Sequence, residues 1–232
     1  MPRSTVVALA LAGLVFGPAS AQDVPTPVPR PKVIAPAAAA VPAAATKPAA
    51  APQAATRPVA ETRGNVFLLR GLMNVFSLGM DTLARKLRAK DIPVRVINYT
   101  RWRDIAPGLV EEYRTNKSVV PVVIIGHSLG ADGAVNMANF LAENGVPVRL
   151  VVAFDGVHDG HTVARGVEEV VNYYKADGWG QLVEAAPGFK GRLQNIDLSD
   201  REEIDHLNIE KSTALHDEVI AKLSAIFAAA RD

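Results

Sequence analysis

One serine lies between two glycines in the segment Gly126-His127-Ser128-Leu129-Gly130. An apolar run at residues 119–125 precedes it, and a helical pattern follows over residues 129–144. A G-x-S-x-G sequence between a strand and a helix predicts a turn so tight that only glycine fits on either side of the serine. The hydroxyl then stands at the carboxyl edge of a parallel sheet, where it can attack a carbonyl carbon. The alternative is a Gly-Ser turn without a chemical role.

The motif and its context resemble those of α/β-hydrolase-fold serine hydrolases, the lipases, esterases and thioesterases in which GHSLGA-type turns are common. The resemblance covers the chain from Asn65 onward, and the serine turn is its most specific part. It implies a nucleophile, an acid and a histidine in that chain order, and two backbone amides that hold an oxyanion.

A serine hydroxyl needs a neutral imidazole that accepts its proton. Among five histidines, His206 lies on a charged loop (SDREEIDHLNIEKS) between the last predicted strand and the last predicted helix. The resemblance places the catalytic histidine on such a loop, so His206 is the predicted general base. We expect His127 to be a packing or pocket residue, because consecutive side chains of the turn diverge, and His216 to lie on the surface of the final helix.

Two further histidines, His158 and His161, have an H-x-x-H spacing on a loop beside Asp155 and Asp159. Histidines and carboxylates are common metal ligands. The spacing on a loop is only a weak metal signature, and we expect no metal site.

The third catalytic group is an acid that accepts a hydrogen bond from the imidazole and stabilises its charged form. Asp155 directly follows the apolar run at residues 148–154, so it should lie at the same sheet edge as Ser128. Some lipases with a similar pattern carry their acid there. Asp197 and Asp200 follow the final predicted strand, where other family members carry it, and they remain alternatives. An aspartate at the end of a strand also often caps a loop or helix.

Two backbone amides are candidates for the oxyanion hole. Leu129 begins the predicted helix, so its amide points toward the position of an oxyanion. The resemblance takes the second amide from the loop after the first strand, where we assign Leu72. Related hydrolases often have His-Gly in this loop, whereas this chain has Arg70-Gly71.

Short apolar runs alternate with amphipathic stretches after residue 63. The predicted strands are residues 65–70, 94–99, 119–125, 148–154 and 192–197, and the predicted helices are residues 80–90, 105–117, 129–144, a segment within 163–175, and 213–230. This alternation predicts an α/β fold with a mostly parallel sheet and helices on both faces. The resemblance implies that the sheet is α/β-hydrolase-like, and the small domain leaves room for only a minimal cap. The stretch between Asp155 and Arg192 contains Trp179 and Leu182, which could line an acyl pocket or pack against the domain.

The N-terminal 63 residues differ from the rest of the chain. Residues 1–21 predict a secretory signal peptide, because Arg3 precedes an apolar run over residues 6–16, and the small residues Ala19-Ser20-Ala21 follow as a cleavage site. The run is too short to span a bilayer. In residues 22–63, alanine and proline supply 23 of 42 positions, which predicts a disordered linker, with contact to the cell envelope as an alternative. Residues 64–232 are the predicted catalytic domain.

The composition excludes several classes of protein. The 232 residues include no cysteine, so the chain has no disulfide scaffold, no cysteine-ligated metal and no thiol nucleophile. The 25 basic and 24 acidic residues give a net charge of +1, which argues against binding to nucleic acid. Residues 1–63 carry a net charge of +4 and the remaining residues one of −3.

These features predict a periplasmic or secreted serine hydrolase that cleaves a small-molecule or lipid ester or thioester through an acyl-enzyme. It would need no cofactor, and it would have no transmembrane anchor after removal of the signal. An acyltransferase would use the same triad with another acceptor in place of water. A non-catalytic envelope-binding protein that retains the hydrolase fold is the alternative from a different class.

Overall fold

A six-stranded parallel sheet forms the centre of the computed structural model, which describes residues 63–72 and 77–230. The strand order is β2-β1-β3-β4-β6-β8, and every neighbouring pair is parallel. Its strands are β1 (Asn65–Arg70), β2 (Val94–Asn98), β3 (Val122–His127), β4 (Val148–Phe154), β6 (Glu169–Tyr174) and β8 (Arg192–Asp197). The predicted signal peptide and all but the last residue of the predicted linker lie outside the described residues.

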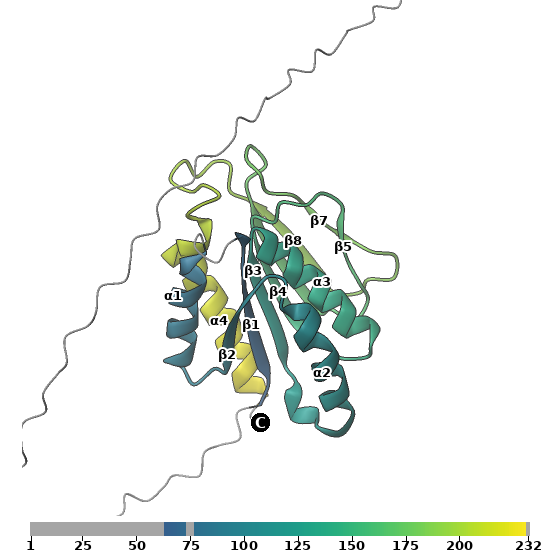
Figure 1. The fold of residues 1–232 in the computed structure, drawn as a ribbon. Coiled ribbons are helices and arrows are strands. Elements are labelled where there is room, and N and C mark those ends of the chain that lie inside the picture. Colours follow the sequence, from purple (N-terminus) through teal and green to yellow (C-terminus); the bar gives the residue numbers. More distant parts are fainter. Residues whose placement is uncertain (1–62, 73–76, 231–232) are drawn as a thin grey trace, which may run out of the picture. The chain divides into compact units, whose positions relative to one another are not determined.

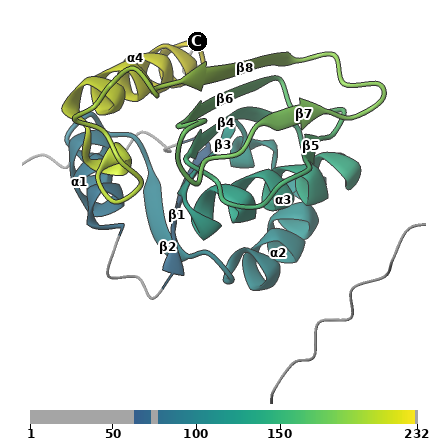
Figure 2. The same cartoon turned by 90° about the horizontal axis from the view of Figure 1, so that it is seen from above.

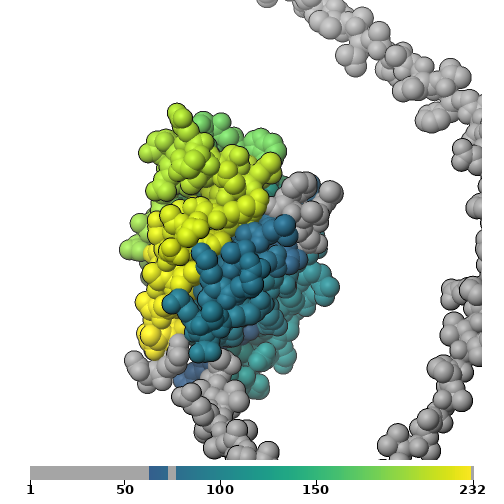
Figure 3. All heavy atoms as spheres, turned by 90° about the vertical axis from the view of Figure 1, so that its left-hand side faces the viewer, coloured from purple at the N-terminus to yellow at the C-terminus, as the bar shows by residue number. Residues whose placement is uncertain are grey.

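Helices cover both faces of this sheet (Figures 1 and 2). They are α1 (Leu78–Arg88), α2 (Trp102–Thr115), α3 (Leu129–Glu143) and α4 (Thr213–Ala229). Buried residues of α1 and α4 pack in one apolar cluster, and those of α2 and α3 pack in a second cluster on the opposite face. Figure 3 shows the outer side of the first layer, where teal α1 lies beside yellow α4. The predicted fold class is therefore confirmed.

Most predicted elements agree with the structure to within a few residues. The third strand begins at Val122 rather than at residue 119, because residues Lys117–Val119 form a short 3-10 helix (η2) and Pro121 has no amide hydrogen for a strand ladder. The helix predicted within residues 163–175 is wrong. Val170, Val171 and Tyr173 are instead buried in β6, between β4 and β8.

The segment between β4 and β8, the excursion, contributes β6 to the main sheet and two short strands outside it. Besides β6 it contains β5 (His161–Val163) and β7 (Val183–Ala185), which pair in parallel as a separate two-stranded sheet. Val163 and Val183 of these strands are buried in the apolar cluster below α3. Within the described residues, the excursion therefore packs on the main domain and does not form a separate cap.

A buried carboxyl group lies beside the start of α1. Glu210, in the 3-10 helix η3 (Ile209–Lys211), is fully buried, and a Cβ on Gly79 would lie 1.9 Å from its Oε2. Burial raises the pKa of Glu210 to about 7, although Lys211 and the amides of Gly79 and Met80 oppose the shift. The folded state therefore binds this proton more tightly than the unfolded state, in which the pKa is near its ordinary value.

We expect Glu210→Gln to change how stability depends on pH. Because the native pKa is raised, the wild type loses stability as the pH increases from about 4.5 to 7, and the neutral glutamine does not. Relative to the wild type, the variant should gain about 3 kcal/mol between pH 4 and pH 8.5. Urea unfolding of both proteins at several pH values measures this. A difference that does not change with pH would contradict the assignment.

None of the helices within residues 63–72 and 77–230 is both long and apolar enough to cross a membrane.

Candidate active site

Ser128 lies on the turn between β3 and α3. Its φ of 56° is in the left-handed region that non-glycine residues rarely adopt. A Cβ on Gly126 would lie 2.0 Å from the carbonyl oxygen of Gly130, and a Cβ on Gly130 would lie 2.1 Å from that of Leu69. Both flanking glycines are therefore required, one by the following helix and the other by the neighbouring strand β1, as the sequence predicts.

The structure brings Ser128, His206 and Asp155 together. His206 Nε2 lies 3.0 Å from Ser128 Oγ, and His206 Nδ1 lies 2.6 Å from Asp155 Oδ2. The carboxylate accepts the hydrogen of Nδ1, so Nε2 is free to accept the serine proton. The three side chains are separated by 78 and 51 positions in the sequence, and only the fold places them in hydrogen-bonding distance.

Asp155 is held at the end of β4 by contacts that leave one oxygen for His206. Its φ is 52°, which turns the chain sharply after the strand. Its Oδ1 accepts a hydrogen bond from the amide of Lys175 at 2.9 Å, and a Cβ on Gly180 would lie 2.1 Å from this oxygen. The carboxylate is 1% exposed. It is therefore a buried, fixed acceptor.

The two alternative acids have different surroundings. Asp197 is exposed at the end of β8, and its Oδ1 accepts hydrogen bonds from the amides of Ala176 and Ser199 and from the Ser199 hydroxyl. The Ser199 hydroxyl and these amides lower the pKa of Asp197. Asp200 is exposed in the same loop. Asp197 thus caps a loop, and it is Asp155 that contacts His206.

The loop after β1 approaches Ser128 closely. A Cβ on Gly71 would lie 2.9 Å from the carbonyl oxygen of His127 and 3.1 Å from the Cβ of Ser128, so glycine at this position lets the loop come this close to the nucleophile. Arg70 does not line the groove at Ser128, and its guanidinium binds both carboxylate oxygens of Asp81 in α1, at 2.5 and 3.0 Å. Leu72 follows directly and is 52% exposed.

A groove of about 480 Å³ opens above Ser128. Leu72 and Leu129, the residues predicted to supply the oxyanion amides, both line it. Trp179 forms another wall, and its ring centroid lies 4.6 Å from that of His206. The full lining comprises Leu72, Ser128, Leu129, Val157, Gly178, Trp179 and Gln181. The groove is therefore mostly apolar beside a single nucleophile. Leu182, the other residue singled out in the excursion, is exposed near it but does not line it.

A chain of buried hydrogen bonds joins the two loops of the site through His127. Its Nε2 lies 2.8 Å from the carbonyl oxygen of His206, which can only accept, so Nε2 carries the hydrogen. Its Nδ1 lies 2.9 Å from Ser77 Oγ, and Ser77 Oγ accepts the amide hydrogen of Gly71 at 2.9 Å. Burial lowers the pKa of His127 to about 4, so the ring is neutral at pH 7, as this pattern requires.

Sequence reasoning placed His127 in a packing or pocket role but did not identify this chain. The sequence contains no signal for it, because Ser77 is 50 positions away and hydroxyl–imidazole pairs have no fixed spacing. The expectation for His216 is wrong. It is 1% exposed, because it lies on the stripe of α4 that also carries Val219, Ile220 and Leu223, and its Nε2 donates to the carbonyl oxygen of Glu210.

The remaining histidines lie apart from the triad. His158 and His161 both contact Asp132, in the first turn of α3. The sequence had placed them beside Asp155 and Asp159. Asp155 instead contacts His206, and Asp159 is exposed.

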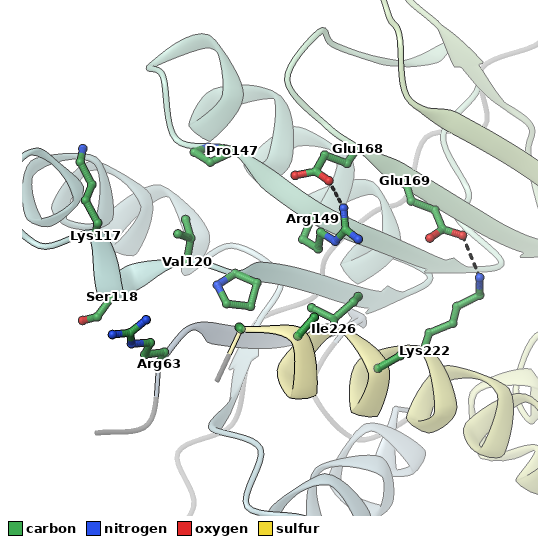
Figure 4. Close-up of a pocket in the computed structure, with 14 residues that line it drawn as sticks. Arg63, Lys117, Ser118, Val120, Pro147, Arg149, Glu168, Glu169, Lys222 and Ile226 are labelled. Carbon is green, nitrogen blue, oxygen red and sulfur yellow. Dashed lines mark hydrogen bonds and ion pairs between the residues drawn. The ribbon is translucent and has the colours of Figure 1, made fainter. Parts of the chain in front are cut away.

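Another hollow, of about 770 Å³, lies at the opposite edge of the sheet, where β3, β4 and β6 begin (Figure 4). Arg149 pairs with Glu168 there, and Lys222 pairs with Glu169 at 2.7 Å. Its one lining hydroxyl, that of Ser118, is bonded to Asn116. Because this hollow offers no nucleophile paired with a base, we place the candidate site at Ser128.

Comparison with known proteins gives matches only at the level of structure. No family model and no curated sequence matches the chain. Est1E from Butyrivibrio proteoclasticus is 12% identical, with a TM-score of 0.43 over 71% of this chain and 90% of that one. YbtT, a type II thioesterase from the yersiniabactin biosynthetic pathway, is 12% identical, with a TM-score of 0.42 over 75% and 96%. A candidate hydrolase of the alpha/beta superfamily from Xanthomonas campestris is 20% identical, with a TM-score of 0.40 over 69% and 99%.

The features that define the fold are present in the chain itself. A parallel sheet is covered by helices on both faces, and a serine turn joins β3 to α3 with the required glycines on both sides. Asp155 and His206, which contact each other and Ser128 in turn, follow the serine in the chain order typical of this fold. The chain therefore has the α/β-hydrolase fold.

Proposed function

We propose that the protein is a serine hydrolase that cleaves a carboxylic ester or thioester and acts in the periplasm or outside the cell. The observation that carries this proposal is the continuous contact from Ser128 Oγ through His206 to Asp155, at 3.0 and 2.6 Å. The site of action follows from the secretory signal predicted in residues 1–21.

In the proposed reaction, Ser128 Oγ attacks the carbonyl carbon while His206 Nε2 takes its proton. Asp155 holds the imidazole in the tautomer that accepts this proton and stabilises the imidazolium that forms. The amides of Leu72 and Leu129 would hold the oxyanion. His206 then gives the proton to the departing alcohol or thiol. Water attacks the acyl-enzyme while His206 takes its proton, and His206 returns this proton to Ser128 Oγ as the carboxylic acid is released.

The shape of the groove supports a substrate with an apolar acyl group. Leu72 and Trp179 line it and are 52% and 63% exposed, so they offer apolar surface that a substrate can cover. Burial of each methylene group contributes about 0.8 kcal/mol. A lipid or small-molecule ester of moderate chain length therefore fits better than a charged substrate.

A series of p-nitrophenyl esters of increasing acyl length, with a matched acyl thioester, tests this proposal. We expect kcat/KM to increase with chain length until the groove is filled, by up to about fourfold for each methylene. Trp179→Ala should flatten this dependence. Absence of turnover on every ester and thioester would contradict the proposed activity.

His127 should act as a positioning residue for His206 and the loop after β1. His127→Phe keeps a ring of similar size but leaves the carbonyl oxygen of His206 and the Ser77 hydroxyl without their partner. We expect kcat to decrease by about 10- to 100-fold with little change in KM, because small displacements of catalytic groups are costly. Steady-state kinetics and a thermal melt on the same sample measure this.

His216→Phe is a matched control for His127→Phe. It also removes a buried histidine that bonds a backbone carbonyl, but it does so on the inner side of α4. We expect this variant to lose stability and keep kcat. If both variants lower kcat equally for a given decrease in Tm, His127 has only a structural role.

A further inference from the structure

A second cluster of ligand-type side chains lies beside the site and has no part in the proposed reaction. Asp132 comes from the first turn of α3, and His158 and His161 come from the loop after β4 and the start of β5. His158 Nδ1 lies 2.5 Å from Asp132 Oδ2, and His161 Nε2 lies 3.1 Å from Asp132 Oδ1. One atom from each of the three residues lies within 4.8 Å of the other two. Three potential ligand atoms are therefore close enough together for one ion to contact all of them.

The inner part of this cluster is buried and incompletely satisfied. The side chains of Asp132 and His161 are 7% and 17% exposed. His161 Nε2 is enclosed and close to the carboxylate, yet it makes no hydrogen bond of normal geometry with the described residues. Whether His161 Nε2 carries a hydrogen or a lone pair, it therefore has no hydrogen-bond partner among the described residues.

The surroundings leave room for additional ligands. A pocket of about 180 Å³ adjoins the cluster and is lined in part by Tyr99, Trp102 and Asn136. It can admit an ion with one or two water molecules. His158 is 64% exposed, so its ring can rotate to adjust the ligand geometry. A Cβ on Gly156 would lie 2.9 Å from Asp132 Oδ1, so glycine at this position lets the loop lie close to the carboxylate as it is oriented here.

We propose that Asp132, His158 and His161 bind a divalent transition-metal ion of the Zn²⁺ type. Two imidazoles and one carboxylate suit Zn²⁺, whereas Mg²⁺ and Ca²⁺ prefer oxygen ligands only. Ligand atoms at about 2.1 Å from a tetrahedral ion lie about 3.4 Å apart. The 3.1 Å contact between His161 and Asp132 would therefore open only slightly, whereas the exposed His158 ring would move back from its 2.5 Å contact by roughly 1 Å. Water would complete the coordination from the adjoining pocket.

The bound ion would fix one wall of the groove. Asp132 lies one helical turn after Ser128, and Val157, which precedes His158, lines the groove above Ser128. An ion that joins α3 to this loop would therefore hold the groove open in one shape without taking part in the proton transfers. The proposal does not depend on hydrolytic activity, because binding of the ion can be measured directly.

The test uses the full chain without a histidine tag, treated with a chelator and then dialysed free of it. Zn²⁺ titrated into the wild type should bind at one ion per chain, and Co²⁺ at the same site should give visible absorption bands. At a free Zn²⁺ concentration about 100 times Kd, Tm should increase by about 5–10 °C. His158→Ala and His161→Ala should each weaken binding by at least about 100-fold.

Two variants show whether a loss of Zn²⁺ binding is specific to the cluster and separate from a loss of folding. Asp159→Asn removes an exposed carboxylate from the same loop outside the cluster, and it should bind Zn²⁺ as the wild type does. Because His158 is exposed, His158→Ala should keep the metal-free Tm of the wild type, so that loss of binding there is not a loss of folding. The proposal is overturned if the wild type binds no Zn²⁺, or if both histidine variants bind it with the affinity of the wild type.

Discussion

Replacement of Ser128 by alanine should lower kcat on any ester substrate by about 10⁴- to 10⁶-fold. The hydroxyl is the only nucleophile in the groove that contacts a histidine, among the residues that the structure describes, so no other group can form the acyl-enzyme. The stability should stay near that of the wild type, because the strained turn keeps the glycines on either side. The measurement is single-turnover hydrolysis of the best ester found in the acyl-length series.

Ser118→Ala is the matched control. Ser118 lies in η2, at the edge of the sheet where β3 begins, and its hydroxyl donates to Asn116 Oδ1 in the same turn. This variant should retain full activity. Ser128→Ala at more than a tenth of the wild-type rate, from a sample free of contaminating esterase, would refute the serine mechanism.

Asp155→Asn should reduce kcat by about 10⁴-fold while the fold is retained. The amide oxygen of asparagine can still accept the hydrogen of the Lys175 amide, as Asp155 Oδ1 does at 2.9 Å. Its NH₂ group would then face His206 Nδ1, which must become an acceptor. The ring hydrogen moves to Nε2, and this nitrogen can no longer take the proton of Ser128. A pH–rate profile and kcat for the variant measure the effect.

Asp197→Asn separates the two assignments that the sequence leaves open. Its carboxylate caps the exposed loop after β8, so the change should alter Tm only slightly and leave kcat within about twofold of the wild type. If Asp197→Asn abolished hydrolysis and Asp155→Asn did not, the acid would be misassigned.

The sequence was sufficient for the sheet because its strands are nearly continuous apolar runs. β1, β4 and β8 agree with their predicted bounds to the residue. β6 was missed because Val163, Val167, Val170 and Tyr174 also fit a helical period, and periodicity alone does not distinguish a buried strand from a buried helix. The partners β4 and β8 decide its conformation, and they are tertiary neighbours.

The residues of the site also differ in whether a local sequence pattern could identify them. The serine turn is a local pattern, so Ser128 could be identified from five consecutive residues. His206 and Asp155 required the order of elements along the chain, because parallel strands bring their carboxyl ends to one edge. Ser77, His127 and Asp132 form their contacts across 50 and 26 positions, with no spacing that a sequence pattern could contain.

Covalent labelling with a fluorophosphonate probe tests most directly whether Ser128 is the nucleophile. Mass spectrometry of the intact chain and its peptides then locates the probe. We predict one probe per wild-type chain, attached at Ser128, with no labelling of Ser128→Ala and labelling of His206→Ala slowed by about 10³-fold or more. A wild type that stays unlabelled, or a Ser128→Ala variant labelled as fast as the wild type, would contradict the assignment of Ser128 as the nucleophile.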